Sequence, residues 1–393
     1  MKRRDTRSTW IGHRTIILVR STGLVPTEDR IESLWQKLKS WARQSSLPND
    51  SLAYLQNDSE VKFQIALERG RGQTGEEVRL SKDTKVAIAI LNWNGARLTE
   101  RCIDALKNSD YGPLEVIVVD NGSTDGSANS IAERYPEVTL IRNSTNLGFA
   151  EGSNQAIRYA MEKDAGYILL LNNDAMVGQK TISRLVETAR AHGNKVAVSP
   201  KIYNGFEQTR LWFVYGKVNL WAGVFSNPAY NAPATAGFDL VLPMEYVVGC
   251  CVLIPRAVIR AVGGFDERFF AYCEDLDWSL RARQAGFSLV CDTRAELWHY
   301  VSSTGARNPA KVRYLMTRNH LWTMRRHATT CQFAVFALVF YPARCLLRLA
   351  KAIKHTQWEC IPAEIHGALD GFLDPVSSGQ PVFAVPARDE EGD

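Results

Sequence analysis

The polar and apolar residues between positions 85 and 300 follow a pattern that predicts strands and helices in alternation. The first apolar run, at 86–91, is uninterrupted, which is typical of a strand buried on both faces. Similar runs predict strands at 114–119, 138–141 and 167–171, and helical spacing predicts helices at 98–107, 127–134, 152–163 and 275–284. This alternation indicates an α/β fold with a parallel sheet and right-handed crossovers.

The segments that flank this region have different patterns. Residues 1–84 are polar and irregular apart from a helical spacing at 31–41, and we expect them to form an N-terminal extension. Residues 306–373 interleave apolar and basic side chains and predict a C-terminal basic helical segment. Residues 374–393 contain Pro and Gly and then acidic residues, which is typical of a disordered tail. We therefore expect one α/β domain at 85–305 with an extension at each end.

The composition indicates a folded protein of a reducing compartment. The 393 residues are 45% hydrophobic and 23% charged, and the net charge of +5 is too mild to indicate nucleic acid by itself. The eight cysteines form no C-x-x-C pair and no zinc-site spacing. No apolar run reaches the roughly 18–20 residues that span a bilayer, since the closest, 333–341, ends at Pro342. We therefore expect a cytoplasmic protein, soluble or bound to a membrane surface.

Polar side chains follow all four predicted strands of the parallel sheet. They lie in the segments 92–95, 120–126, 143–149 and 172–174 and are mostly amides and carboxylates. Because open parallel sheets bind ligands at the carboxyl ends of their strands, these side chains are candidate ligand contacts. They suit the edges of a base, the hydroxyls of a ribose and a hard cation.

Familiar nucleotide-binding loops are absent from these positions. A dinucleotide fold places G-x-G-x-x-G after its first strand, where this chain has Asn92-Trp93-Asn94-Gly95. The chain has no Walker-type phosphate loop, and the same segment lacks the Gly-rich, Arg/Lys-bearing loop of sugar nucleotidyltransferases. Redox, phosphate-loop and nucleotidyl-transfer functions are therefore disfavoured.

The order and spacing of the motifs resemble those of glycosyltransferase family 2, whose members are inverting enzymes with the GT-A fold. The resemblance extends over 86–325, and the matching pieces are 92–95, 118–127, 146–154, 170–174, 249–251, 263–270, 274–278 and His299. The subgroup that the chain resembles most is that of the rhamnosyltransferase-like enzymes of bacterial polysaccharide and cell-wall assembly.

The resemblance implies a GT-A (nucleotide-diphospho-sugar transferase) fold with a mostly parallel central sheet. It also implies metal-dependent transfer from a dTDP- or UDP-sugar, with dTDP-rhamnose favoured, to a glycan or lipid-linked acceptor. Asp120 would accept a hydrogen bond from the imide N–H of uracil or thymine, although it also suits a cap of the turn that follows it. The other residues implied to contact the donor are Asn92, Asn94, Asn121, Asn146, Gly148, Asn154, Asn172, Asn173 and Arg318.

The resemblance also assigns a metal site and a general base. Asp174 would be the main protein ligand of Mg²⁺ or Mn²⁺, and His299 and the donor diphosphate would complete the shell. Asn172 stands where the family usually has the first Asp of Asp-x-Asp, so the site has one carboxylate. Asp275 would be the general base, with Glu274 as the second candidate. A plain helix cap is the alternative role of Asp275.

Several alternatives stay open from the sequence. The single carboxylate also allows a nucleotide-sugar-binding protein that is catalytically impaired. Arg318, next to Asn319, either contacts the diphosphate or orders the active-site loop. The basic, apolar segment at 307–354 has no Asp or Glu and predicts contact with a membrane surface, without a motif for nucleic acid. Ordinary helix packing with snorkelling arginines produces the same pattern.

Overall fold

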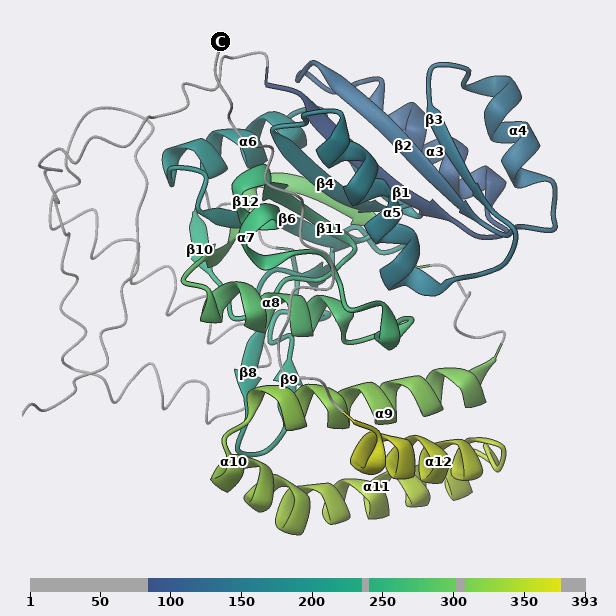
Figure 1. The fold of residues 1–393 in the computed structure, drawn as a ribbon, viewed down its shortest axis with the longest axis vertical. Helices are drawn as coiled ribbons and strands as arrows, with labels where there is room; N and C mark the ends of the chain where they lie inside the picture. Colours follow the sequence, from purple (N-terminus) through teal and green to yellow (C-terminus); the bar gives the residue numbers. More distant parts are fainter. Residues whose placement is uncertain (1–83, 235–239, 302–307, 376–393) are drawn as a thin grey trace, which may run out of the picture. The chain divides into compact units, whose positions relative to one another are not determined.

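The computed structural model describes residues 84–234, 240–301 and 308–375, which Figure 1 draws in colour. The extension predicted for residues 1–84 lies outside the described residues except for Thr84. The predicted tail beyond residue 375 lies outside them as well.

The main sheet contains parallel and antiparallel strands in the order β10–β12–β6–β11–β4–β1–β2–β3, with β5 paired to β12 and β7 to β6. Its strands are β1 (Val86–Asn92), β2 (Leu114–Asn121), β3 (Thr139–Asn143), β4 (Tyr167–Asn172), β5 (Ala175–Val177), β6 (Val196–Asn204), β7 (Leu211–Phe213), β10 (Val241–Pro243), β11 (Cys251–Pro255) and β12 (Ser288–His299). A separate hairpin pairs β8 (Lys217–Asn219) with β9 (Val224–Ser226).

The parallel half of the sheet agrees with the sequence prediction. β4, β1, β2 and β3 are parallel neighbours, and β11 runs antiparallel between β4 and β6. The side chains of β1 are almost entirely buried, which is why its sequence is apolar at successive positions. The third predicted helix starts earlier than expected, at Gly148 instead of residue 152.

Helices cover both faces of this parallel half. The chain moves outward from β1 to β3 through α3 (Ala96–Leu106) and α4 (Ser127–Arg134), and it returns to β4 through α5 (Gly148–Glu162). Right-handed crossovers therefore put α5 on the opposite face from α3, and Figure 1 shows α5 in front of the sheet with α3 behind it. The second half adds α6 (Thr181–Ala191), α7 (Arg256–Val262) and α8 (Glu274–Gln284).

The strand register brings the polar strand ends together. In the pairing of β1 with its neighbours, Asn92 lies opposite Asp120 and Leu91 opposite Asn172. In the pairing of β2 with β3, Asn121 lies opposite Asn143. The four ends therefore lie side by side at one edge of the sheet, as the sequence predicts.

The residues after 308 form helices that pack on α8 through α9. They are α9 (Pro309–His327), α10 (Thr330–Val335), a π-helical turn (Phe336–Phe340), α11 (Tyr341–Lys354) and α12 (Cys360–Leu373). A small apolar core joins these helices to the β8–β9 hairpin, with Leu321, Met324, Phe336 and Tyr341 at its centre and Leu220 and Phe225 packed against it.

The expectation that no segment is long enough to cross a bilayer is wrong for one helix. The segment Thr330–Lys354 forms 25 helical residues that are apolar and long enough for a span, by length and composition only. Pro342 lies in the first turn of α11 and does not end the helix. A π-helical turn, Phe336–Phe340, precedes it. Among the described residues this is the one helix of this kind.

Candidate active site

The ends of β1 and β2 are joined by hydrogen bonds around Asp120. Asn92 Nδ2 donates to Asp120 Oδ1 (2.7 Å), and the N–H of Ser123 donates to Asp120 Oδ2 (3.1 Å). The Thr99 hydroxyl in turn donates to Asn92 Oδ1 (2.7 Å). Asp120 therefore does cap the turn that follows it. Each of its oxygens still has a lone pair, so the cap and a contact with a base N–H are compatible.

Asn121 fixes the loop that follows β3. Its Nδ2 donates to Asn146 Oδ1 (3.1 Å) and to the carbonyl of Gly148 (2.9 Å), and its Oδ1 accepts from the N–H of Leu147 (3.1 Å). Gly148 has a φ of +90°, and a Cβ atom there would lie 2.4 Å from the carbonyl oxygen of Phe270. The loop thus requires glycine at this position and lies against the segment that precedes α8.

Three more of the predicted donor contacts lie at the same edge. Asn94 Oδ1 accepts from the N–H of Thr124 (2.8 Å), which links the loops after β1 and β2. Asn173 Nδ2 donates to the Thr99 hydroxyl (3.0 Å). Asn172 is part-exposed at the end of β4. Their contact with a donor stays a prediction.

Asn154 has a different environment from the other predicted donor contacts. It is fully buried, and its Nδ2 donates to the carbonyl of Phe265 (2.9 Å) and to Glu267 Oε1 (2.9 Å). Its Oδ1 accepts from the N–H of Phe265 (2.9 Å). Both ends of the amide therefore join α5 to the segment before α8, and the geometry supports a positioning role for Asn154.

Asp174 and His299 meet although they are far apart in the sequence. β5 pairs with β12 so that Ala175 lies opposite His299, and the N–H of Tyr300 donates to the carbonyl of Asp174 (2.8 Å). His299 Nε2 lies 3.0 Å from Asp174 Oδ1, and both side chains are buried. The Trp212 ring stands edge-on to the imidazole, with 4.3 Å between the ring centres.

This pair fits part of a site for a divalent cation. Neighbouring ligands of an octahedral ion at about 2.1 Å lie about 3 Å apart. The 3.0 Å between Asp174 Oδ1 and His299 Nε2 matches that separation. The described residues contain no group of three or more His, Cys, Asp or Glu side chains that could hold a metal. The described residues thus offer a candidate site with two ligands, which a substrate diphosphate would have to complete.

Asp275 lies beside the same edge, in the first turn of α8. The N–H of Asn172 donates to the carbonyl of Cys250 (2.9 Å), which sets the chain before β11 next to the end of β4. The N–H of Gly249 then donates to Asp275 Oδ2 (2.9 Å), and the N–H of Leu276 donates to its Oδ1 (2.8 Å). The strand ends and the acidic helix start therefore belong to one site.

Asp275 and Glu274 differ in their surroundings. Burial raises the pKa of Asp275, but its two N–H donors oppose the rise. Burial, followed by the charge of Asp275, holds the pKa of Glu274 well above its usual range, and Glu274 Oε2 has no hydrogen-bond partner among the described residues. The upward shift is therefore stronger for Glu274 than for Asp275, and the role of Asp275 as the general base stays a prediction. Cys273 occupies the N-cap position, so Asp275 is not the N-cap residue, although its Oδ1 accepts from the N–H of Leu276 in the first turn of α8.

The loop before α8 has a strained backbone that a side chain of α9 supports. Phe270, Tyr272 and Cys273 have positive φ values of 63°, 71° and 67°. Such conformations cost on the order of 1–3 kcal/mol each and persist only where surrounding contacts impose them. Asn319 Nδ2 donates to the carbonyls of Ala271 (2.8 Å) and Tyr272 (2.8 Å), which holds this loop in place.

Arg318 contacts the same loop. Its Nη2 donates to the carbonyls of Arg268 (3.0 Å) and Phe269 (3.3 Å), and its guanidinium lies 4.2 Å from the centre of the Trp322 ring. Of the two roles that the sequence leaves open for Arg318, these contacts support the ordering of the loop. Contact with the diphosphate stays a prediction.

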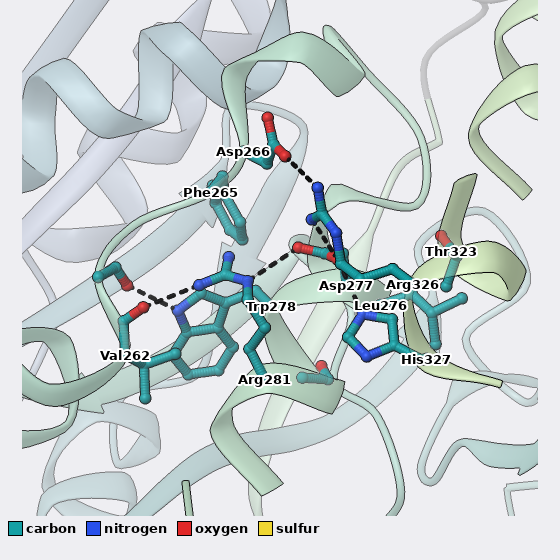
Figure 2. Close-up of polar contacts among 12 residues, drawn as sticks. Val262, Phe265, Asp266, Leu276, Asp277, Trp278, Arg281, Thr323, Arg326 and His327 are labelled. Atoms are coloured by element: carbon teal, nitrogen blue, oxygen red, sulfur yellow. Dashed lines mark hydrogen bonds and ion pairs between the residues drawn. The ribbon is translucent and has the colours of Figure 1, made fainter. Parts of the chain in front are cut away.

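A buried ion-pair network, drawn in Figure 2, joins α8 to α9 and was missed by the sequence analysis. Asp277 is fully buried and is bound by Arg281 (2.9 Å), Arg326 (2.7 Å) and His327 (2.8 Å), while Arg326 also binds Asp266 (2.7 Å). Burial alone would raise the pKa of Asp277, but these partners hold it below its usual range. The i, i+4 spacing of Asp277 and Arg281 was the available signal.

Replacing Arg326 by Met is expected to lower the free energy of unfolding by about 3–5 kcal/mol, because Asp266 and Asp277 would lose a buried cation. Urea unfolding followed by circular dichroism measures this. The control is Arg134→Met, which breaks the pair of an exposed arginine with Glu100 and should cost at most about 1 kcal/mol. Equal losses in the two variants would contradict a structural role for the network.

Comparisons with known proteins agree on one family. Residues 87–262 match the family model described as glycosyl transferase family 2. The chain is 30% identical over 248 residues to the N-acetylglucosaminyl-diphospho-decaprenol L-rhamnosyltransferase of Mycobacterium tuberculosis. The aligned region covers 58% of this chain and 80% of that relative. It is 26% identical over 206 residues to a low-salt glycan biosynthesis hexosyltransferase of Haloferax volcanii. Here the aligned region covers 52% of this chain and 63% of that relative.

Among solved structures, the chain is similar to the mannosyltransferase PcManGT from Pyrobaculum calidifontis in complex with GDP-Man and Mn²⁺. The sequence identity is 18% and the TM-score is 0.47, with 75% of this chain and 88% of that chain covered.

Proposed function

Because the chain belongs to glycosyltransferase family 2 and is a glycosyltransferase of the GT-A type, we propose that it transfers a sugar, with inversion, from a dTDP- or UDP-linked donor to a glycan or lipid-linked acceptor. The observation that carries this proposal is the convergence of three features at one edge of the sheet. They are the carboxylate of Asp120, the Asp174–His299 pair and the carboxylate of Asp275.

In the proposed reaction, Asp275 accepts the proton of the acceptor hydroxyl while the hydroxyl oxygen attacks the anomeric carbon of the donor sugar. The bond from this carbon to the diphosphate oxygen breaks, and the nucleoside diphosphate leaves with the electron pair. Attack from the side opposite the leaving group inverts the anomeric configuration. The N–H groups of Gly249 and Leu276 hold the carboxylate and favour the ionised form that the base requires.

We propose that Asp174 and His299 hold Mg²⁺ or Mn²⁺, with the donor diphosphate as a further ligand. Bound there, the cation would neutralise the charge that develops on the leaving diphosphate. Asp174 is the one carboxylate of this pair, so the chain depends on the substrate to complete the shell.

The preferred donor and acceptor in this proposal follow from the relative. The name of this relative describes L-rhamnosyl transfer to N-acetylglucosaminyl-diphospho-decaprenol, so dTDP-rhamnose and a lipid-linked acceptor of polysaccharide or cell-wall assembly are the first candidates. Such an acceptor would place the enzyme at the cytoplasmic face of a membrane, in contact with the surface through its C-terminal segment.

The experiment that tests this function measures nucleoside diphosphate released from dTDP-rhamnose and from a panel of UDP-sugars, with and without a polyprenyl-diphosphate N-acetylglucosamine acceptor. Release should require the acceptor and Mn²⁺ or Mg²⁺, and EDTA should abolish it. Calorimetry on the same samples addresses the second candidate, a binding protein without turnover, which the lone Asp174 carboxylate favours. Tight donor binding with no release for any acceptor would support that candidate.

Replacing Asp120 by Asn is expected to raise the KM for the donor about ten- to a hundredfold, with little change in kcat. The variant keeps the shape of the side chain but loses an acceptor for the imide N–H of the base. Initial rates over a range of donor concentrations measure the effect. The matched control is Asp125→Asn, an exposed carboxylate of the same turn, for which we expect a change below about twofold. Similar KM values in both variants would contradict the base contact.

A further inference from the structure

The helix after residue 330 exposes several of its apolar side chains. Leu338, Leu346 and Leu347 are 79%, 69% and 67% exposed. The large apolar side chains that are exposed on the π-helical turn and α11 form what we call the apolar ridge. They are Leu338, Val339, Phe340, Leu346, Leu347, Leu349 and Ile353. A surface of this kind on a folded domain indicates a binding surface.

The arginines of the same helix point the other way, into the protein. Arg344 Nη2 donates to the carbonyl of Gly223 (2.8 Å), and its Nη1 lies 3.0 Å from His320 Nδ1. Burial, and then the charge of Arg344, lowers the pKa of His320 to about 3, so the ring is neutral beside this cation. Arg348 Nη1 donates to Glu364 on α12 (3.0 Å). These two arginines therefore bind groups of the protein itself. For them the structure favours ordinary helix packing, one of the two alternatives that the sequence leaves open, over contact with a membrane surface.

This arrangement argues against a helix that crosses a bilayer. The 25 residues of Thr330–Lys354 would extend about 38 Å, enough for a hydrocarbon core of about 30 Å. However, Phe336 and Tyr341 lie in a protein core, and Arg344 is bound to the β8–β9 turn. One side of the helix is thus occupied by protein along its length, and only the ridge side can meet lipid.

The surroundings of the ridge fit a lipid surface. Lys351 and Lys354 are exposed at the end of α11, and no Asp or Glu occurs between Leu297 and Trp358. Trp358, an amphipathic residue typical of membrane interfaces, is 57% exposed just beyond the helix. An apolar strip whose own helix carries lysines and no carboxylate is complementary to the interface of an anionic bilayer, although Glu359 is exposed directly after Trp358.

We propose that the apolar ridge inserts into one leaflet of a bilayer with α11 lying in the plane of the interface, so that the chain binds the membrane without crossing it. This inference deepens the proposed function, because a lipid-linked acceptor has its reactive sugar at that surface. The ridge also connects to the active site through α9. Arg348 donates to Thr317 (3.3 Å), and Asn319 on the same helix holds the loop before Asp275.

The test is flotation of the purified full chain with vesicles of phosphatidylcholine alone and of phosphatidylcholine with one quarter phosphatidylglycerol, in 0.15 and 0.5 M salt. The wild type should float with both kinds of vesicle at both salt concentrations. The double variant Leu346→Ser/Leu347→Ser should lose at least about tenfold in partitioning, because two apolar side chains no longer enter the lipid. Lys351→Gln/Lys354→Gln should float like the wild type with phosphatidylcholine alone and at the higher salt concentration. With the anionic vesicles at the lower salt concentration, its partitioning should fall to the level seen with phosphatidylcholine alone.

The control variant is Phe206→Ser, which removes an exposed apolar side chain outside the ridge and should float like the wild type. The proposal is overturned if the wild type stays unbound, if the Leu346/Leu347 variant floats equally, or if 0.5 M salt releases the wild type. Resistance of membrane-bound protein to alkaline carbonate would instead indicate a spanning helix. If sedimentation velocity shows that the wild type is a dimer and the Leu346/Leu347 variant is a monomer, the ridge binds a second copy of the chain. Both outcomes also overturn the proposal.

Donor turnover by the same preparations, measured with a water-soluble acceptor and without vesicles, separates this inference from the proposed function. A wild type that turns over donor but does not float would contradict membrane binding by the ridge and leave the proposed function unaffected. A wild type that floats but turns over no donor would contradict the proposed function and still support membrane binding by the ridge.

Discussion

Replacing Asp275 by Asn is expected to lower kcat for sugar transfer by about 10²- to 10⁴-fold, while the Kd for the donor changes little. The side chain keeps its size, and one oxygen still accepts from a backbone N–H, but the group can no longer accept a proton from the acceptor hydroxyl. In the wild type, activity should rise with pH through the pKa of Asp275, which burial raises above that of an ordinary aspartate. The residual activity of the variant should lack this acid limb.

Steady-state rates between pH 4 and 9 and calorimetric donor binding measure both parts of this prediction. The matched comparison is Glu274→Gln, one residue away. Burial, followed by the charge of Asp275, raises the pKa of Glu274 and favours its neutral form, which an amide resembles. The loss should therefore be at least tenfold smaller than for Asp275→Asn. A larger loss in Glu274→Gln than in Asp275→Asn would indicate that Glu274, and not Asp275, is the general base.

Replacing Asp174 by Ala is expected to reduce turnover by roughly a hundredfold or more, because the cation would lose its one protein carboxylate. The same change leaves His299 without the oxygen that lies 3.0 Å from its Nε2. The EDTA response makes the prediction specific. EDTA should bring the wild type down to the level of Asp174→Ala, and it should have little further effect on the variant.

Thermal unfolding of Asp174→Ala shows whether a loss of activity reflects a loss of fold, since the side chain is buried. Asn173→Ala serves as the neighbouring control. It removes a hydrogen bond to Thr99 but no charge, and its sensitivity to EDTA should match that of the wild type. An Asp174→Ala enzyme that stays active and EDTA-sensitive would place the metal elsewhere.

The sequence predicts the parallel half of the fold well because its signals are local. An uninterrupted apolar run such as β1 is buried on both faces, and each run ends where polar residues begin, so strands and candidate ligands are read from the same pattern. The meeting of Asn92 with Asp120 follows from this, since parallel strands of similar length end at one edge.

Other parts of the site depend on contacts that sequence spacing does not contain. Asp174 meets His299 through the pairing of β5 with β12, and only the family resemblance pointed to that histidine. The basic residues of the C-terminal segment are a clearer case. Arg326 and Arg344 look like surface cations in the sequence, yet they bind Asp277 and the carbonyl of Gly223 inside the protein. The direction of a long side chain is set by partners distant in the chain, which periodicity cannot report.

The most direct test of the central claim is transfer from dTDP-rhamnose to a polyprenyl-diphosphate N-acetylglucosamine acceptor in the presence of Mn²⁺, with the product analysed by NMR. The account predicts a glycosidic bond whose anomeric configuration is inverted relative to the donor, formed by the wild type and lost in Asp275→Asn. A product with retained configuration, or the same product at the same rate from the variant, would contradict it.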